Sequence, residues 1–194
     1  MAKNEVIINS GLHKIASAQA IALANQAKNI HLNIGDDPQV HDVLAFLVTA
    51  GLSIELYFKA LMIVGRSGRV TKGHQLKKLY DEFPDFLKES LLKEYQTQQA
   101  DIELPIQVFA LIQRSEQPSS PDSQKTFSNF NTFDTAIESI NNIFTRSRYF
   151  FEEVNQSDYS YIEYPVGQIK AVIFALDATY NAFLANAFMN KEPQ

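Results

Sequence analysis

The first group of side chains that could do chemistry lies within a long apolar segment, residues 43–64. Glu55 and Lys59 stand four positions apart there, so in a helix they share one face, with the acid before the base as such pairs prefer. Two interpretations stay open. The residues form an ion pair that favours one packing arrangement, or they line a polar site between helices that binds a ligand.

A basic segment follows the apolar one. No acidic residue interrupts it, although the whole chain carries a net charge of −5, and its cations are Arg66, Arg69, Lys72, Lys77 and Lys78. These cations would complement the negative end of the preceding helix dipole. The alternative is an edge that contacts the phosphates of RNA or of a nucleotide. The first interpretation is favoured, because a nucleic-acid-binding domain usually has an overall basic excess.

A third group lies in an aromatic-rich segment and consists of Arg146, Arg148 and Tyr149. Unpaired guanidinium groups are costly to bury, so both arginines need acidic partners or solvent. Pairing with Glu55 or Glu152 and binding of a phosphate are both open.

Other kinds of site are excluded by composition and spacing. Without cysteine the chain has no disulfide, iron–sulfur cluster or thiol nucleophile. Its four histidines are scattered, no Glu has a His three positions later, and neither a phosphate-binding glycine loop nor a serine nucleophile motif occurs. We therefore predict no metal and no cofactor.

The elements that must position these groups have the pattern of helices. The chain has 194 residues, 45% of them hydrophobic and 20% charged, which suits a single domain over 1–194. Residues 43–64 are apolar in nearly every direction, so other helices must surround them. The sequence thus predicts an all-α fold, an up-and-down helical bundle with a long central helix. Ala50, Gly51 and Ser53 would let a neighbour approach it closely.

Turn and capping residues give the boundaries of the first two helices. The first is predicted from about Leu12 to about Ile34, capped by Ser10, with an inward stripe of Ile15, Ala18, Ala22, Ile30 and Ile34. The second should start at Asp37-Pro38 and end at Gly65 and Gly68.

Later segments alternate helices with breaks. The sequence predicts a helix from near His74 that breaks at Phe83-Pro84 and resumes, a helical turn over 105–113, a mobile surface loop over about 115–128, a helix capped by Asn131 or Thr132 that continues to about Val154, a polar turn over 155–164, and a last helix from Pro165 to about Met189.

Localisation depends on two segments. Residues 1–10 lack the apolar core of a signal peptide, and 43–64 is long enough to cross a bilayer. Two charged residues near the middle of a membrane helix would be costly. We therefore expect a cytoplasmic protein without membrane contact.

Three short motifs resemble the HEPN superfamily of helical bundles: residues 50–61 (AGLSIELYFKAL), residues 73–80 (GHQLKKLY) and Arg148-Tyr149. In that family a helix with Glu-x-x-x-Lys-Ala-Leu precedes a Gly-His-x-Leu helix start, and a later helix carries an Arg-Tyr motif. The resemblance covers the middle half of the chain. It implies a bundle that is often a homodimer and is associated with RNA cleavage, nucleotide transfer or prokaryotic defence.

Nuclease members of that family use an Arg-x(4–6)-His motif, in which two protomers bring Arg and His to one RNA phosphate. Arg146 and Arg148 have no histidine after them. Arg69 and His74 match the spacing, but they lie where the family's Gly-His element belongs. We therefore predict that His74 ties this loop to a neighbouring helix, and Arg69 and His74 stay as catalytic candidates only.

The resemblance and the missing nuclease motif together lead to one functional prediction. The chain is expected to be a HEPN-like, non-catalytic interaction module, a homodimer that works with a protein partner from the same operon in a defence, toxin–antitoxin or nucleotidyltransferase-linked system. One alternative is a metal-independent ribonuclease. The other is a nucleotide or small-ligand binding protein with Glu55, Lys59 and Arg148 in an interhelical pocket.

Overall fold

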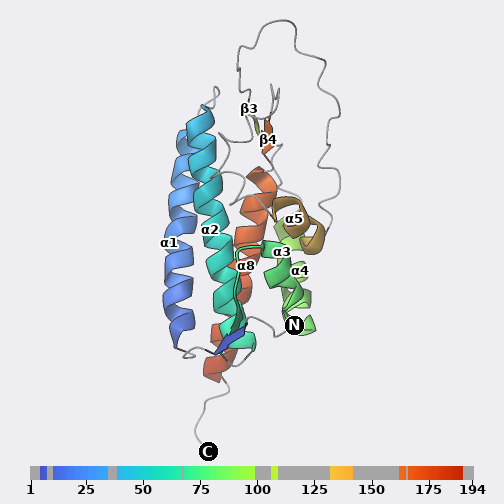
Figure 1. Cartoon of the computed structure of the whole chain (residues 1–194). Helices are drawn as coiled ribbons and strands as arrows, with labels where there is room; N and C mark the ends of the chain where they lie inside the picture. Colours follow the sequence, from blue (N-terminus) through green and yellow to red (C-terminus); the bar gives the residue numbers. More distant parts are fainter. Residues whose placement is uncertain are drawn as a thin grey trace, which may run out of the picture.

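The computed structural model shows a bundle of helices (Figure 1). It describes residues 5–7, 11–34, 39–66, 68–98, 106–108, 132–141, 162–164 and 166–189. The described helices are α1 (Leu12–Asn33), α2 (Val40–Gly65), α3 (Leu76–Asp81), α4 (Asp85–Gln98), α5 (Phe133–Ile140) and α8 (Val166–Met189). The predicted all-α class is confirmed.

Helix α2 is the centre of the bundle. It runs antiparallel to α1 on one side and contacts α3 and α8 on the other, while α4 and α5 pack against α8 (Figure 1). Among the described helices it alone is long and apolar enough to cross a membrane, yet 67% of its most apolar stretch is buried inside the bundle. The predicted central helix is confirmed, and its burial favours a core helix over a membrane span.

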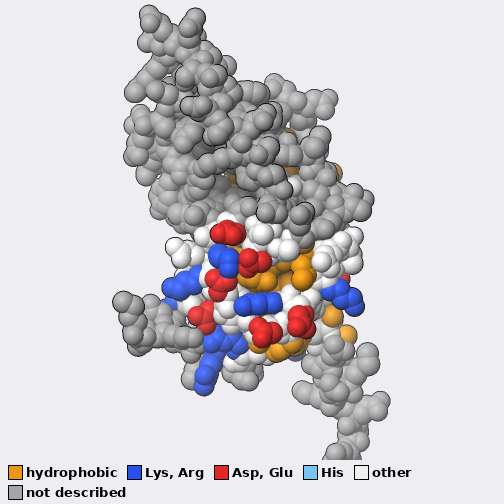
Figure 2. Space-filling model, turned by 90° about the vertical axis from the view of Figure 1, so that its right-hand side faces the viewer, with side chains coloured by type: hydrophobic (Ala, Val, Ile, Leu, Met, Phe, Trp, Pro, Cys, Tyr) orange, Lys and Arg blue, Asp and Glu red, His pale blue; other side chains and the backbone are white. Residues whose placement is uncertain are grey.

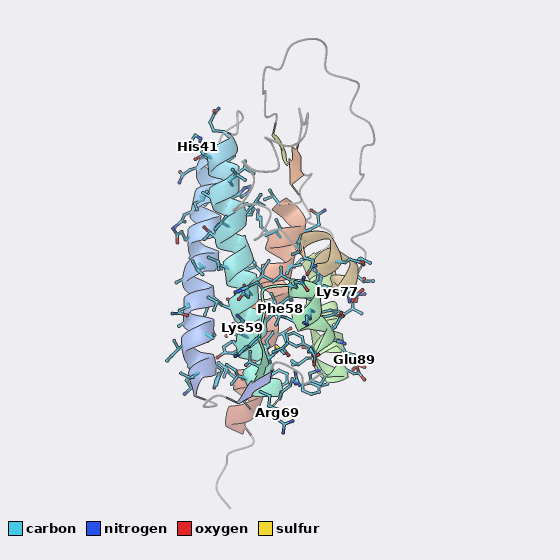
Figure 3. The ribbon with its side chains drawn as sticks, viewed as in Figure 1. His41, Phe58, Lys59, Arg69, Lys77 and Glu89 are labelled. Atoms are coloured by element: carbon cyan, nitrogen blue, oxygen red, sulfur yellow. The ribbon has the colours of Figure 1, made fainter. Side chains whose placement is uncertain are left out.

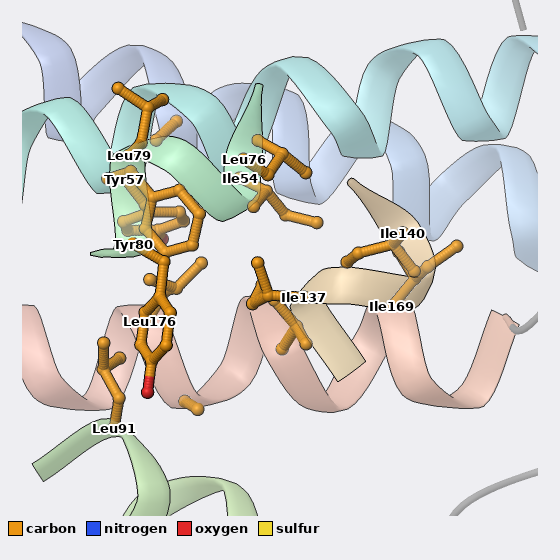
Figure 4. Close-up of a cluster of buried hydrophobic side chains, with 14 of the residues drawn as sticks. Ile54, Tyr57, Leu76, Leu79, Tyr80, Leu91, Ile137, Ile140, Ile169 and Leu176 are labelled. Atoms are coloured by element: carbon orange, nitrogen blue, oxygen red, sulfur yellow. The ribbon is translucent and has the colours of Figure 1, made fainter. Parts of the chain in front are cut away.

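The core on the α3, α4 and α5 side of α2 is built from large side chains. Figure 4 shows part of it, with Ile54 and Tyr57 of α2 facing residues of α3, α5 and α8. Phe133 of α5 is fully buried and contacts the rings of Phe58, Tyr80 and Tyr95, with centroid distances of 6.4, 5.4 and 5.7 Å. Rings at such distances attract one another beyond the apolar area they bury.

Small side chains pack α1 against α2. The Ser53 hydroxyl of α2 donates a 2.8 Å hydrogen bond to the Ala20 carbonyl of α1, and both residues are fully buried. The predicted inward stripe was therefore wrong in part: the buried residues of α1 are Ser17, Ala20 and Ala27, whereas Ile15, Ala18 and Ala22 are exposed. The face with the smallest side chains turns inward because α2 approaches the α1 backbone closely.

Several boundaries agree with the capping residues. Helix α2 ends at Gly65, and Gly68 takes a φ of +87° while its N–H donates to the Ile63 carbonyl at 2.8 Å. Thr132 caps α5 by accepting from the Thr135 N–H at 3.2 Å. The break at Phe83-Pro84 and the span of α8 were also predicted correctly.

Two starts differ. The residue before α1 is Gly11 and not Ser10, and α2 begins at Val40 after Gln39, two positions later than Pro38. Gly11 has no side chain with which to cap α1, and the Gln39 side chain makes no capping bond to α2. A local capping signal is weak evidence here, because tertiary packing stabilises most helices in proteins.

Four short strands were not predicted. β1 (Glu5–Ile7) pairs antiparallel with β2 (Arg69–Thr71), and β3 (Ile106–Val108) with β4 (Ile162–Tyr164). The helical turn predicted over 105–113 is thus wrong where the structure describes it, as is the end of the predicted turn over 155–164. β-Branched and aromatic residues favour such pairing once a partner strand is brought near. The loop predicted over 115–128 lies outside the described residues.

Candidate functional site

The predicted pair of Glu55 and Lys59 forms, and a third residue joins it. Lys59 Nζ lies 2.5 Å from Glu55 Oε1, one turn along α2. His74 Nδ1 lies 3.0 Å from Oε1 and 2.9 Å from Oε2 of the same carboxylate. The Glu55 side chain is only 6% exposed, so its charge is satisfied by two basic groups that reach it from the surface. We call these three residues the Glu55 cluster.

The backbone before α3 brings His74 to this carboxylate. Buried Val70 and Thr71 hold β2 against the bundle, and Leu76 holds the start of α3. Between them Gly73 has a φ of +132°, which side-chain-bearing residues rarely adopt. The chain can therefore turn from β2 into α3 with His74 facing α2, as we predicted for a residue that ties the loop to a neighbouring helix.

A second long-range contact holds the start of α3. The Lys77 N–H donates a 2.7 Å hydrogen bond to the Asn141 side-chain oxygen at the end of α5. This bond satisfies one of the amides that a helix start leaves without an intrahelical partner. The sequence carries no signal for it, because a distant residue replaces the usual local cap.

Arg69 does not belong to the Glu55 cluster. It lies on β2, opposite Ile7 of β1, and its side chain is exposed. Figure 3 shows Arg69 at the strand end of the bundle, below Lys59 on α2. Within the part of the chain that the structure describes, no hydrogen bond or ion pair links Arg69 to His74.

The basic segment is partly neutralised by acidic partners. Arg66 pairs with Glu82 at 3.4 Å, and Lys77 pairs with Asp81 and, at 3.2 Å, with Asp134. The pKa of Lys77 is raised mainly by the hydrogen bond that Lys77 donates to Asp81. Figure 2 shows basic and acidic side chains intermixed on the visible described face. This pattern favours a solvated, internally paired segment over one continuous phosphate-binding edge.

The remaining candidates, Arg146, Arg148 and Tyr149, lie outside the described residues. Over the described ranges, no group of three or more potential metal ligands from His, Asp or Glu occurs. The Glu55 cluster is the one predicted ligand site whose members the described residues bring into contact.

The geometry of the Glu55 cluster fits two roles, one catalytic and one structural. A carboxylate that accepts Nδ1–H fixes the tautomer of an imidazole and turns Nε2 outward, the arrangement used by many general bases. The same hydrogen bonds tie α2 to the start of α3. The sequence identified Glu55 and Lys59 as a pair, but it suggested arginine as the partner of Glu55, and only the Gly-His element indicated that His74 reaches a helix.

Comparison with known proteins adds no relative. No protein-family model matches the chain, and no curated protein or solved structure is significantly similar to it.

Proposed function

We propose that this chain is a HEPN-like, non-catalytic interaction module that forms a homodimer and binds a protein partner encoded beside it, in a prokaryotic defence, toxin–antitoxin or nucleotidyltransferase-linked system. One observation carries the non-catalytic part. His74, the one histidine with nuclease spacing to an arginine, is bonded to the buried Glu55 carboxylate while Arg69 lies exposed on β2. Under this proposal the cluster holds the bundle together.

Electrostatics supports the structural role. A buried carboxylate without partners would cost several kcal/mol, whereas Glu55 has both oxygens occupied. Lys59 comes from the same helix, so it contributes no tertiary restraint. His74 is the member that connects two elements, which makes it the residue to test.

The experiment compares RNA cleavage and stability for the same set of variants. His74→Ala should lower the free energy of unfolding by about 1 kcal/mol through the lost hydrogen bonds. No metal-independent RNA cleavage should be seen for the wild type or for any variant. Lys78→Ala, which removes another exposed cation of the basic segment, is the matched control and should leave the stability unchanged.

Positive evidence requires the assembly itself. The purified chain should sediment as a dimer at micromolar concentration, and co-expression with the product of the adjacent gene should give a stoichiometric complex. A monomer that forms no such complex would refute the interaction proposal.

A second candidate, a metal-independent ribonuclease, is favoured by one specific observation. The His74 side chain is 67% exposed while a buried carboxylate orients its ring. If His74 transfers a proton and Arg69 stabilises the phosphate, either alanine substitution should lower the cleavage rate by roughly 100-fold or more. Cleavage lost in both variants at unchanged melting temperature would replace the first proposal with this one.

A further inference from the structure

Helix α8 packs on one side of the pair formed by α1 and α2. Ser17 of α1 donates a 2.9 Å hydrogen bond to the Tyr180 hydroxyl of α8, and Tyr57 of α2 donates one of 2.7 Å to Asp177. In Figure 1 no described helix lies in front of α1 and α2. The side of this pair that is turned away from α8 is therefore an outer surface of the described bundle.

On α1 the side away from α8 carries a stripe of mostly apolar residues. Ala20 marks the line of contact with α2, and Ser17 lies on the α8 side of that line. With one turn every 3.6 residues, five residues lie about a quarter turn to the other side of Ala20. All five are at least partly exposed, and they are Leu12, Gln19, Leu23, Gln26 and Ile30.

A second stripe lies on the same side of α2. Ser53 marks the contact with α1, and the same helical geometry places five partly or fully exposed residues beside it. By contrast, Ile54 and Phe58 on the opposite side of α2 are fully buried. The residues of this second stripe are Ala45, Val48, Leu52, Leu56 and Lys59. We call the two stripes together the α1–α2 face.

The charges on the α1–α2 face allow a copy of the same face to pack against it. Its one charged residue, Lys59, is already paired with Glu55 of the same helix. The face shown in Figure 2 differs, because acidic and basic side chains are intermixed over it. Two α1–α2 faces would thus meet without the like-charge repulsion that opposes a wrong partner.

The area of the α1–α2 face is sufficient for a specific dimer. Two adjacent helices are about 20 Å wide and the stripes are roughly 25 Å long, which gives about 500 Å² of flat area on each copy. The relief of the side chains adds to this value. Two copies would therefore bury more than the roughly 1,000 Å² that a specific interface needs.

The spacing of the apolar residues suits a two-fold axis. Val48 and Leu56 are each four residues from Leu52, so antiparallel packing around an axis at Leu52 places Val48 of one copy against Leu56 of the other. The hydrogen bond between α1 and α2 fixes their relative height, and the same axis then places Leu12 opposite Ile30. The face is thus complementary to itself in both stripes.

We propose that the α1–α2 face is the interface through which two copies of this chain form a dimer. The inference rests on the proposed function, which includes a homodimer, and it adds where the two copies meet. Dimerisation removes the aliphatic side chains of both stripes from water. The glutamines of α1 then lie among them as the polar groups of the interface.

Sedimentation equilibrium of the full chain at micromolar concentration tests the proposal. Leu52→Glu brings two carboxylates together at the axis, so it should weaken dimerisation at least about 100-fold. Leu32→Glu is the matched control, because Leu32 is 69% exposed and lies outside the α1–α2 face. It should leave the dimer unchanged. Circular dichroism checks that both variants are folded.

Cross-linking tests the same face without adding a charge. The chain has no cysteine, so a single introduced cysteine reports on its own position. Leu52→Cys should give a covalent dimer with a short bis-maleimide, and Leu32→Cys should not. This result decides the question if Leu52→Glu does not fold.

The outcomes separate this inference from the proposed function. A wild-type dimer in which both Leu52 variants behave like their Leu32 controls would overturn the α1–α2 face and leave the homodimer standing. A monomeric wild type would overturn both. If the monomer also loses the product of the adjacent gene through Leu52→Glu, the face binds that protein and not a second copy.

Discussion

The two sides of α2 are packed in opposite ways. Toward α3, α4 and α5 its neighbours are large side chains, among them Phe133 of α5, which contacts three other aromatic side chains. On α1 the buried residues are alanine and serine, and the Ser53 hydroxyl of α2 donates directly to the α1 backbone.

The difference shows two ways to exclude water from a long apolar helix. Large side chains fill the volume between elements that stay apart, so stability on that side depends on the volume they occupy. Small side chains let two helix backbones approach closely, so stability on the other side depends on these side chains staying small. Beyond the Ser17–Tyr180 hydrogen bond that joins α1 to α8, small residues such as Ala24 and Ala171 line a cavity of about 580 Å³.

The largest expected effect comes from removing volume on the aromatic side. Phe133→Ala should lower the free energy of unfolding by about 3–5 kcal/mol, because it deletes a fully buried ring and leaves a cavity. Chemical denaturation measures this change. Leu32→Ala, at a side chain that is 69% exposed, is the control and should change stability little. Equal losses in both variants would contradict the packing described for α5.

The second effect comes from adding volume on the small-residue side. Ala20→Leu should cost about 1–3 kcal/mol, because the larger side chain forces α1 away from α2 at a fully buried position. Ala22→Leu on the exposed side of the same helix is the matched control. A stabilised Ala20→Leu protein would show that α1 is less closely packed than the Ser53 hydrogen bond indicates.

The sequence predicted the large-residue side better than the small-residue side. Each of three local patterns predicts one structure: the apolar run 43–64 a buried helix, the proline a helix break, and Thr132 a helix start. The structure confirmed all three. In α1, alanine occurs on nearly every face, so periodicity could not tell which face is buried. The same limit applies to the short strands, whose partners lie tens of residues away in the chain.

Less of the candidate site than of the fold could be predicted from the sequence. The spacing of Glu55 and Lys59 predicts their pairing, because helix geometry alone brings them together. That His74 joins them depends on the path of the chain through Gly73 and on where α3 begins, which are tertiary properties.

A single hydrogen bond on the small-residue side gives the third effect. Ser53→Ala should lower the free energy of unfolding by about 1 kcal/mol, since it removes the bond to the Ala20 carbonyl and keeps the side chain small. Ser90→Ala on α4 is the control, because it makes the same change in helix propensity and leaves the hydrogen bond to Ala20 in place. If the two variants are equally stable relative to wild type, the hydrogen bond adds nothing and close packing alone joins α1 to α2.

The smallest expected effect on stability concerns a buried tyrosine on the aromatic side of α2. It is absent at neutral pH. Burial raises the pKa of Tyr95 to about 12, whereas an unfolded tyrosine titrates near a pKa of about 10. The folded state therefore holds this proton after the unfolded state has lost it. The tyrosine contribution is fully present below pH 10 and is lost as the pH rises toward 12. Tyr95→Phe should unfold less steeply with pH over that interval, as followed by denaturation at fixed pH steps. The same slope in wild type and variant would mean that Tyr95 titrates as an exposed phenol, and its place against Phe133 would then be wrong.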